Sequence, residues 1–289
     1  MRVLQNNFAN NFGLVGKSVR RYLATTALTA TGLMALATPG LADNWTDHVA
    51  DEGSISIDTA IPNTTNITQH TNFVKVHGDG DINAGWTVNV AQPSSSSKYV
   101  LYDVENDPTQ IMGALNANGQ IYIFDQNGVI FGEGSQVNVG SIVASTGFIK
   151  DADIKNDQLK FVNVGGNGAA GNIVLKGTVS VGDAGLAAFV APGVENAGVI
   201  NAKMGKVALA SGDTVTLDLY GDGLVEIAAD GKLENALVKN SGTINAEGGT
   251  VVLSAQAAKG AVDDVINMDG VIDVSSVSVK GGKIVLSGG

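Results

Sequence analysis

The chain has 289 residues with 28 acidic and 17 basic side chains, which gives a formal net charge of −11. This balance argues against nucleic acid as a partner, because binding to phosphates requires a basic surface. Cysteine is absent, which excludes disulfides, thiol chemistry and metal sites with cysteine ligands, so stability has to come from packing and hydrogen bonds.

Residues 1–42 have the features of a signal peptide with a long basic region. No acidic residue occurs before Asp43, and the basic residues precede the apolar part: Arg2, Lys17, Arg20 and Arg21. An apolar run over 22–37 is followed by small residues, and we expect cleavage near Ala42. The run is too short for a membrane span, which needs about 20 apolar residues, so we expect no integral membrane segment. The adjacent arginines leave twin-arginine export open as an alternative.

Residues 43–116 are expected to form an N-terminal cap and the start of the main fold. Brief alternation of apolar and polar residues predicts short strands at 55–57, 73–76 and 86–90. The serine-rich stretch after Pro93 predicts an exposed loop, because it can bury no apolar area. A short helix is predicted only at 109–115.

Residues 117–289 contain an internal repeat and many glycine-marked turns. The frame Asn-x-Gly-x-Ile-x-Ala-x-x-Gly-x-Val-x-Leu starts at Asn196 and again at Asn240, and looser copies include Asn267 and Gly171. The first two copies are 44 residues apart, whereas Asn240 and Asn267 are 27 apart. We interpret 27 residues as one coil with a small insertion and 44 as two coils of about 22, within the period range of solenoids.

Apolar residues step by two within each unit, as in strands with one buried face. They are Ile200, Ala202, Val207, Leu209, Val215, Leu217 and Leu219. One unit cannot bury such a face alone, so we predict an all-β fold in which coils stack about 4.8 Å apart into a parallel β-helix. Asparagine at recurring turns fits this fold, because its amide can bond along the stack.

Residues 118–146 form the strongest local motif, a close series of strands and turns. Strands are predicted at 121–124, 129–131 and 137–139. Asn127 and Gly128 predict a turn between the first two strands, since both tolerate positive φ. From residue types alone, this is a structural β-turn.

The segment resembles the N-terminal secretion domain of filamentous-haemagglutinin-like exoproteins, the passengers of two-partner secretion, also called the haemagglutination activity domain. The matching positions are Asn118, Gly119, Gln120, Asn127, Gly128, Val129, Phe131, Gly132, Val137, Asn138, Val139, Gly140, Ala144, Ser145 and Thr146. Where that family usually has Asn-Pro, this chain has Asp125 and Gln126, so we expect a turn without the rigidity of proline. The likeness extends to residues 221–224 and to the repeats.

The resemblance implies a right-handed parallel β-helix with N-terminal cap strands. It implies that an outer-membrane transporter barrel with periplasmic recognition domains recognises the N-terminal domain and passes the chain to the cell surface or the medium. The exported β-helix would act as an adhesin-like surface protein, with a host or neighbouring-cell surface as a further partner. No catalysed reaction and no cofactor are implied, and residues 117–289 would be the first coils of a longer chain.

A secreted carbohydrate-active enzyme is the alternative function, because parallel β-helices also carry such activities. Glycosidases need two carboxyl groups about 5 to 9.5 Å apart, and the candidate pairs are Asp213 with Asp218 and Asp263 with Asp264. Most acidic residues here fall at turns, where a solvated surface explains them. The histidines show no ligand spacing, the Gly-Asp fragments at 78–81 and 221–223 lack the tandem array of calcium repeats, and the glycine-rich loop at 163–168 leads into a strand.

Overall fold

The computed structural model describes residues 43–166, 170–218, 225–227, 233, 236–256, 266–275 and 283–288. The expected signal peptide, the motif fragment at 221–224, Leu219 and the pair Asp263 and Asp264 lie outside these ranges. No helix in the described ranges has the length and apolar character needed to cross a membrane.

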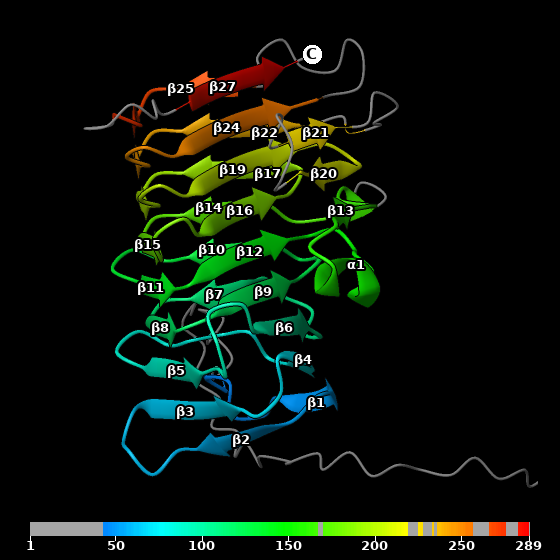
Figure 1. The fold of residues 1–289 in the computed structure, drawn as a ribbon, viewed down its shortest axis with the longest axis vertical. Coiled ribbons are helices and arrows are strands. Elements are labelled where there is room, and N and C mark those ends of the chain that lie inside the picture. The colour runs from blue at the N-terminus through cyan, green and yellow to red at the C-terminus, as the bar shows by residue number, and fades with distance from the viewer. Residues whose placement is uncertain are drawn as a thin grey trace, which may run out of the picture. The chain divides into compact units, whose positions relative to one another are not determined.

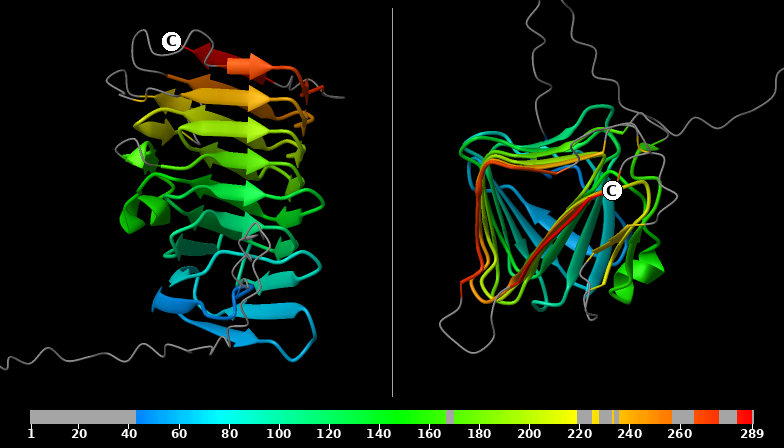
Figure 2. Two further views of the ribbon diagram at one scale, coloured as in Figure 1. Left: turned by 180° about the vertical axis from the view of Figure 1, so that it is seen from behind. Right: turned by 90° about the horizontal axis from the view of Figure 1, so that it is seen from above.

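Short strands stack into three sheets that run along the described part of the chain and surround one interior (Figures 1 and 2). Sheet A contains, in spatial order, β1 (Val49–Glu52), β4 (Phe73–Gly78), β6 (Lys98–Asp103), β9 (Gln120–Phe124), β12 (Ser141–Ser145), β16 (Leu186–Val190), β19 (Lys206–Ser211), β24 (Thr250–Ala255) and β27 (Lys283–Gly288). Sheet B contains β2 (Ile55–Asp58), β3 (Thr64–Gln69), β5 (Thr87–Ala91), β8 (Ala114–Ala117), β11 (Gln136–Val139), β15 (Thr178–Val181), β18 (Val199–Asn201), β23 (Thr243–Asn245) and β26 (Val271–Asp273). Sheet C contains β7 (Thr109–Ile111), β10 (Val129–Phe131), β14 (Ile173–Leu175), β17 (Gly193–Asn196), β22 (Leu237–Asn240) and β25 (Ile266–Met268).

The N-terminal strands of sheets A and B differ from the others in direction. β1 pairs with β4 and β2 pairs with β3 in antiparallel fashion, whereas β3 with β5 and β4 with β6 begin the parallel ladders. Parallel pairing then continues through both sheets to β26 and β27. The predicted all-β fold and parallel β-helix are therefore confirmed.

The offset of 44 residues in the repeat is one coil, not two. Val199 of β18 is the direct register partner of Thr243 of β23, so the two copies of the frame lie on neighbouring coils. The pair Thr178 and Val199 shows the uninterrupted period, 21 residues. The additional residues leave the stack as β20 (Val215–Leu217) and β21 (Val225–Ile227), which pair with each other outside it. Because this insertion is about as long as a coil, sequence spacing could not distinguish the two.

A second insertion follows β12, and it contains α1 (Asp151–Lys155) and β13 (Leu159–Phe161). β13 pairs antiparallel with β20, so the two insertions share a small side sheet beside sheet A. The helix predicted at 109–115 is wrong, because this stretch forms β7 and β8. Thr109 and Ile111 point inwards with Gln110 between them half-buried, the two-residue alternation of a strand.

The buried apolar side chains form two clusters. Ile200, Ala202, Val207 and Leu209 belong to the interior cluster of the β-helix, as predicted. Val215 and Leu217 were expected there too, but they belong to a second cluster on the outer face of sheet A, under the insertions. This second cluster lies between the outer face of sheet A and the insertions. In the described part of the chain, no helix or strand covers the outer face of sheet B in the same way (Figure 2).

Candidate functional site

The motif at 118–146 makes one complete coil of the β-helix. It runs through β9 in sheet A, β10 in sheet C and β11 in sheet B, and it returns to sheet A as β12. Each strand is paired on both sides, for example β10 with β7 and β14. The candidate residues are thus distributed around the coil rather than gathered at one point.

Asp125 holds the corner between β9 and β10 with a buried carboxylate. Its Oδ1 accepts from the backbone N–H of Asn127 at 2.7 Å, which closes an Asx turn. Its Oδ2 accepts from the backbone N–H of Thr109 at 2.6 Å, and Thr109 lies one coil earlier. Hydrogen bonds therefore hold this turn in place at the position where the family described above usually has Asn-Pro.

Gly128 completes the same corner in a conformation that favours glycine. Its φ is +111°, and a Cβ atom there would lie 2.5 Å from the carbonyl oxygen of Asn172 in the next coil. That carbonyl accepts from the N–H of Val129 at 3.1 Å, so it cannot move away without loss. Glycine at position 128 is thus required by the stacking of coils.

Three carboxylates hold the corners of successive coils near this turn. Asp81 accepts from the backbone N–H of Gln110, and Asp103 Oδ2 accepts from the N–H of Gly80 at 2.9 Å. Burial raises the pKa of Asp125 to about 6 and that of Asp81 to about 7, although the backbone donors act in the opposite direction. Burial raises the pKa of Asp103 as well.

The hydroxyl of Thr109 lies between two of these carboxylates. Its Oγ1 is 2.7 Å from Asp103 Oδ2 and 3.0 Å from Asp125 Oδ2. A hydroxyl has one proton to donate, so both contacts are hydrogen bonds only when one of the two carboxyl groups is protonated. The geometry and the raised pKa values therefore both indicate that the carboxyl groups at this corner bind a proton more readily than exposed carboxyl groups do.

A row of asparagines runs along the outer face of sheet B. Nδ2 of Asn138 donates to Oδ1 of Asn116 at 3.1 Å, Asn116 donates to Asn89 at 3.0 Å, and Asn89 donates to Asn66 at 2.9 Å. Asn196 and Asn240, which open the repeat frame, form a buried pair of the same kind at 2.6 Å. The prediction that asparagine amides bond along the stack is confirmed.

Two candidate residues with exposed side chains, Asn118 and Asn138, border a shallow surface groove of about 390 Å³. Gly140 also lines it, together with Ser180 and Gly182 of the next coil. Ser180 is the register partner of Asn138 and takes the place of asparagine in the row. Strands β3 to β23 of sheet B contain no charged residue, so the groove lies in an uncharged polar face.

Comparison with known proteins identifies the family. The model of the TPS secretion domain matches residues 52–289. The chain belongs to the TPS secretion domain family. Two heme/hemopexin-binding proteins of Haemophilus influenzae are similar to it, one 30% identical over 221 residues and the other 28% identical over 281. These stretches cover 72% and 90% of this chain but 23% and 29% of those proteins, so the chain spans about a quarter of the length of the curated relatives it matches.

A solved structure supports the fold of this TPS domain. The HMW1 secretion domain from Haemophilus influenzae has a TM-score of 0.69 to it, at 24% sequence identity. The similarity covers 83% of this chain and 61% of that one. At this identity the likeness shows the fold alone, and it agrees with the β-helix described above.

Most candidate residues of the TPS domain are buried. Gly119, Gly128, Val129, Phe131, Gly132, Ala144, Ser145 and Thr146 are buried, as is Asp125. Ser145 Oγ accepts from the N–H of Gly147 at 3.0 Å, and the Thr146 hydroxyl donates to the Val164 carbonyl at 2.8 Å. Gln126 is exposed, and Gln120, Asn127 and Gly140 are partly buried. Sequence reasoning could not separate these two groups, because it did not give the direction of each side chain at a corner.

The other polar candidates do not converge on a site in the TPS domain. His48 is buried, and its Nδ1 and Nε2 lie 2.8 Å from the Tyr99 hydroxyl and 3.0 Å from the Asp79 carbonyl oxygen. His70 contacts Ser56, and His77 Nδ1 lies 2.9 Å from Asp51 Oδ1. Among the described residues, no group of three His, Cys, Asp or Glu side chains could hold a metal ion. Asp213 and Asp218 flank β20 on the side sheet.

Acidification from pH 8 to pH 6.5 is expected to stabilise the TPS domain. Because the folded-state pKa of Asp81 lies near 7, above its ordinary value near 4, the folded chain binds the proton more tightly, and stability falls as pH rises through 7. Asp81 is half-buried and its charge is screened, so we expect a change on the order of 1 kcal/mol, measured by urea unfolding.

Two variants check this assignment. Asp81→Asn keeps the acceptor for Gln110 and should flatten the dependence above pH 6.5, whereas Asp183→Asn, at an exposed turn, should leave it unchanged. Below pH 6.5 His48 acts in the opposite direction, because burial lowers its pKa to about 4 and the folded chain resists its protonation. An equal slope in both variants would show that other groups cause the effect.

Proposed function

We propose that this chain is the export-directing N-terminal part of a passenger of two-partner secretion. An outer-membrane transporter barrel recognises it in the periplasm through periplasmic recognition domains and releases it at the cell surface or into the medium. The family match over residues 52–289 carries this proposal. Residues 1–42 act as the signal peptide, cleaved near Ala42, residues 43–116 as the N-terminal cap, and residues 117–289 as the first coils of a longer β-helix.

The groove on sheet B is the part of the motif that the transporter contacts. Asn118 and Asn138 expose their side chains there, whereas Asp125, Gly128 and Phe131 are buried and maintain the coil. Interfaces avoid charge at their centres because uncompensated charges are costly to desolvate, and this face of sheet B is uncharged in a strongly acidic chain.

Asn138→Lys is expected to reduce release to the medium and binding to the isolated periplasmic domains of the transporter by about tenfold, because a lysine would be buried without a partner. The matched control is Asn245→Lys. Asn245 is exposed, lies on the same row and donates to Asn201 at 2.9 Å, as Asn138 does to Asn116, but it is three coils away. We expect the control to stay within about twofold of the unchanged chain.

Two results would contradict different parts of the proposal. Equal export of folded Asn138→Lys and Asn245→Lys chains would remove the groove as the contact. Export that is equally efficient in cells without the transporter would overturn the secretion function itself. Asn127→Ala combined with Gly128→Ala is also expected to stop export, but through misfolding of the corner, so it does not test recognition.

After export, the β-helix serves as an adhesin-like surface protein with a host or neighbouring-cell surface as its partner.

A carbohydrate-active enzyme is the second candidate, because β-helices host such sites. The groove on sheet B contains no carboxylate, and a second hollow beside α1 contains one, Asp153, whereas a glycosidase needs a facing pair. Turnover of a polysaccharide that is lost on changing one carboxylate would favour the enzyme. The two Haemophilus relatives are named for binding heme and hemopexin, but they are much longer proteins. We assign these ligands to no residue of this chain.

A further inference from the structure

Residues 148–161, which we call the strap, leave the stack after β12 and lie against the outer face of sheet A (Figure 1). Ile149, Ile154, Leu159 and Phe161 are buried in the second apolar cluster. From sheet A the cluster includes Val100 of β6, Tyr122 and Phe124 of β9, and Val143 of β12. The apolar side chains thus anchor the strap over the middle of the sheet.

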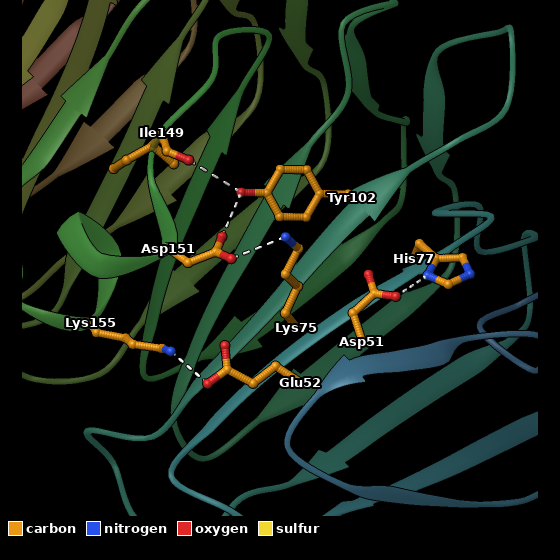
Figure 3. A network of polar contacts seen from close by, with 8 residues as sticks. All are labelled: Asp51, Glu52, Lys75, His77, Tyr102, Ile149, Asp151 and Lys155. Carbon is orange, nitrogen blue, oxygen red and sulfur yellow. Dashed lines mark hydrogen bonds and ion pairs between the residues drawn. The ribbon is translucent and has the colours of Figure 1, made fainter.

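The polar side chains of the strap reach further, to the first strands of the chain (Figure 3). Lys155 Nζ lies 2.6 Å from Glu52 Oε1 on β1, and Asp151 Oδ2 lies 3.0 Å from Lys75 Nζ on β4. The Tyr102 hydroxyl at the end of β6 donates to the Ile149 carbonyl at 3.4 Å. Two charges of α1, Asp151 and Lys155, therefore pair with opposite charges on β4 and β1.

The lysines also contact aromatic rings beside these ion pairs. Lys155 Nζ is 4.5 Å from the ring centroid of Phe73 on β4, and Lys75 Nζ is 5.0 Å from that of Tyr102. Lys98 of β6 pairs with Asp157 of the strap at 3.0 Å, and only 10% of the Lys98 side chain is exposed. The aliphatic parts of these lysine side chains pack against apolar groups, so the ion pairs are partly shielded from water. Such pairs are stronger than ion pairs that are fully exposed to solvent.

The strap spans five neighbouring strands of sheet A, in the order β1, β4, β6, β9 and β12. At about 4.8 Å per strand, this is a distance of about 19 Å along the stack. The contact between Glu52 and Lys155 joins residues 103 positions apart in sequence. It can form only after the coils up to β12 and the strap itself are folded.

β1 has few other contacts to hold it. Val49 is 54% exposed, and of the four residues of β1 only Ala50 packs against the interior cluster. Its single neighbour in the sheet is β4, and the pairing has an irregularity between Ala50 and Glu52. A strand with so little buried apolar area belongs to the part of a protein that opens first.

We propose that the strap is a latch that holds β1 and β4 on the stack, so that the N-terminal end opens and closes with the strap independently of the coils after β12. The latch is sensitive to ionic strength, because its contacts to β1 and β4 are half-exposed ion pairs. Its use in export rests on the proposed function: the first coils stay easy to unfold until the strap has closed.

Hydrogen exchange of the purified whole chain tests the latch without any transporter. In the double variant Lys75→Met and Lys155→Met, amide exchange in β1 and β4 is expected to accelerate about 5- to 30-fold, while β19 and β24 stay within about twofold. The matched control is Lys150→Met with Lys160→Met, which removes two exposed charges from the strap away from β1 and should change neither region. In the unchanged chain, 1 M NaCl should reproduce most of the acceleration.

Further variants keep the proposal falsifiable. Exchanging the charges, Glu52→Lys with Lys155→Glu, should give slower exchange in β1 than Lys155→Glu alone, although the contact of Lys155 with Phe73 is lost. Ile154→Ala should accelerate β1 and β4 more than β24. Unchanged exchange of β1 and β4 in the double lysine variant would overturn the latch. So would equal acceleration in β19, because the strap would then contribute only to global stability.

Discussion

Replacing Phe131 by alanine is expected to lower the free energy of unfolding by about 3–5 kcal/mol, through lost burial and the cavity that remains. Phe131 is fully buried inside the β-helix, on β10 in sheet C. It meets Phe189 of the next coil edge-on, with ring centroids 5.8 Å apart. Because β10 is paired on both sides, backbone movement cannot fill the space.

Urea unfolding followed by circular dichroism measures this loss, and Ile130→Ala is the matched control. Ile130 precedes Phe131 on the same strand but points outwards and is half-buried. Ile130→Ala should therefore lower the free energy of unfolding by less than about 1.5 kcal/mol. Similar losses for both variants would contradict the register of β10. Export of the Phe131→Ala chain should decrease only in proportion to its folded fraction, because the Phe131 side chain is not exposed at the surface.

The position of Phe131 illustrates what the sequence could predict. The sequence predicted a strand at 129–131, and the two-residue rule correctly predicted that Ile200 to Leu209 face inwards. The rule depends only on strand geometry, which is local. It failed for Val215 and Leu217, because alternation shows that one face is buried but does not show against which layer.

The two other wrong predictions have a common origin in non-local pairing. At 109–115 the residues are compatible with a short helix, but the ladder with β10 and a bridge to Ile82 make Thr109 to Ile111 a strand. The offset of 44 residues was counted as two coils, because an insertion that pairs outside the stack has the same strand-like composition as a coil. In both cases the deciding contact lies on a neighbouring coil or in a side sheet.

The candidate site was predicted as a segment, but its division into roles was not. The motif placed Asp125 at a turn, whereas its bond to Thr109 connects two coils and leaves no signal in local spacing. Likewise, Asn138 was chosen with its neighbours, and only the register with Ser180 places it in a groove. The strap was not predicted at all, since five helical residues are too few to show a periodic pattern.

Asp125→Ala is expected to cost about 2–4 kcal/mol at pH 7, the second large effect. The N–H of Asn127 and one contact of the Thr109 hydroxyl would lose their acceptor, and the N–H of Thr109 would keep only its longer bond to the Gly128 carbonyl at 3.1 Å. The loss of an acceptor costs about 1–3 kcal/mol for each donor. Gln126→Ala is the control, because its side chain is exposed at the same turn, and it should change stability by less than about 0.5 kcal/mol. Equal losses would show that the turn sequence matters rather than the buried carboxylate.

The pH dependence of this loss distinguishes the contribution of the Asp125 charge from that of the space its side chain fills. Burial holds the folded-state pKa of Asp125 near 6, above its ordinary value near 4, so protonation stabilises the unchanged chain as pH falls from 7 towards 4. The alanine variant lacks this contribution, and its deficit relative to the unchanged chain should therefore be larger at pH 5 than at pH 8. Urea unfolding of both chains at the two pH values measures the difference. A deficit that shrinks at pH 5 would mean that the corner is held by an ionised Asp125, and the shared proton at Thr109 would have to be abandoned.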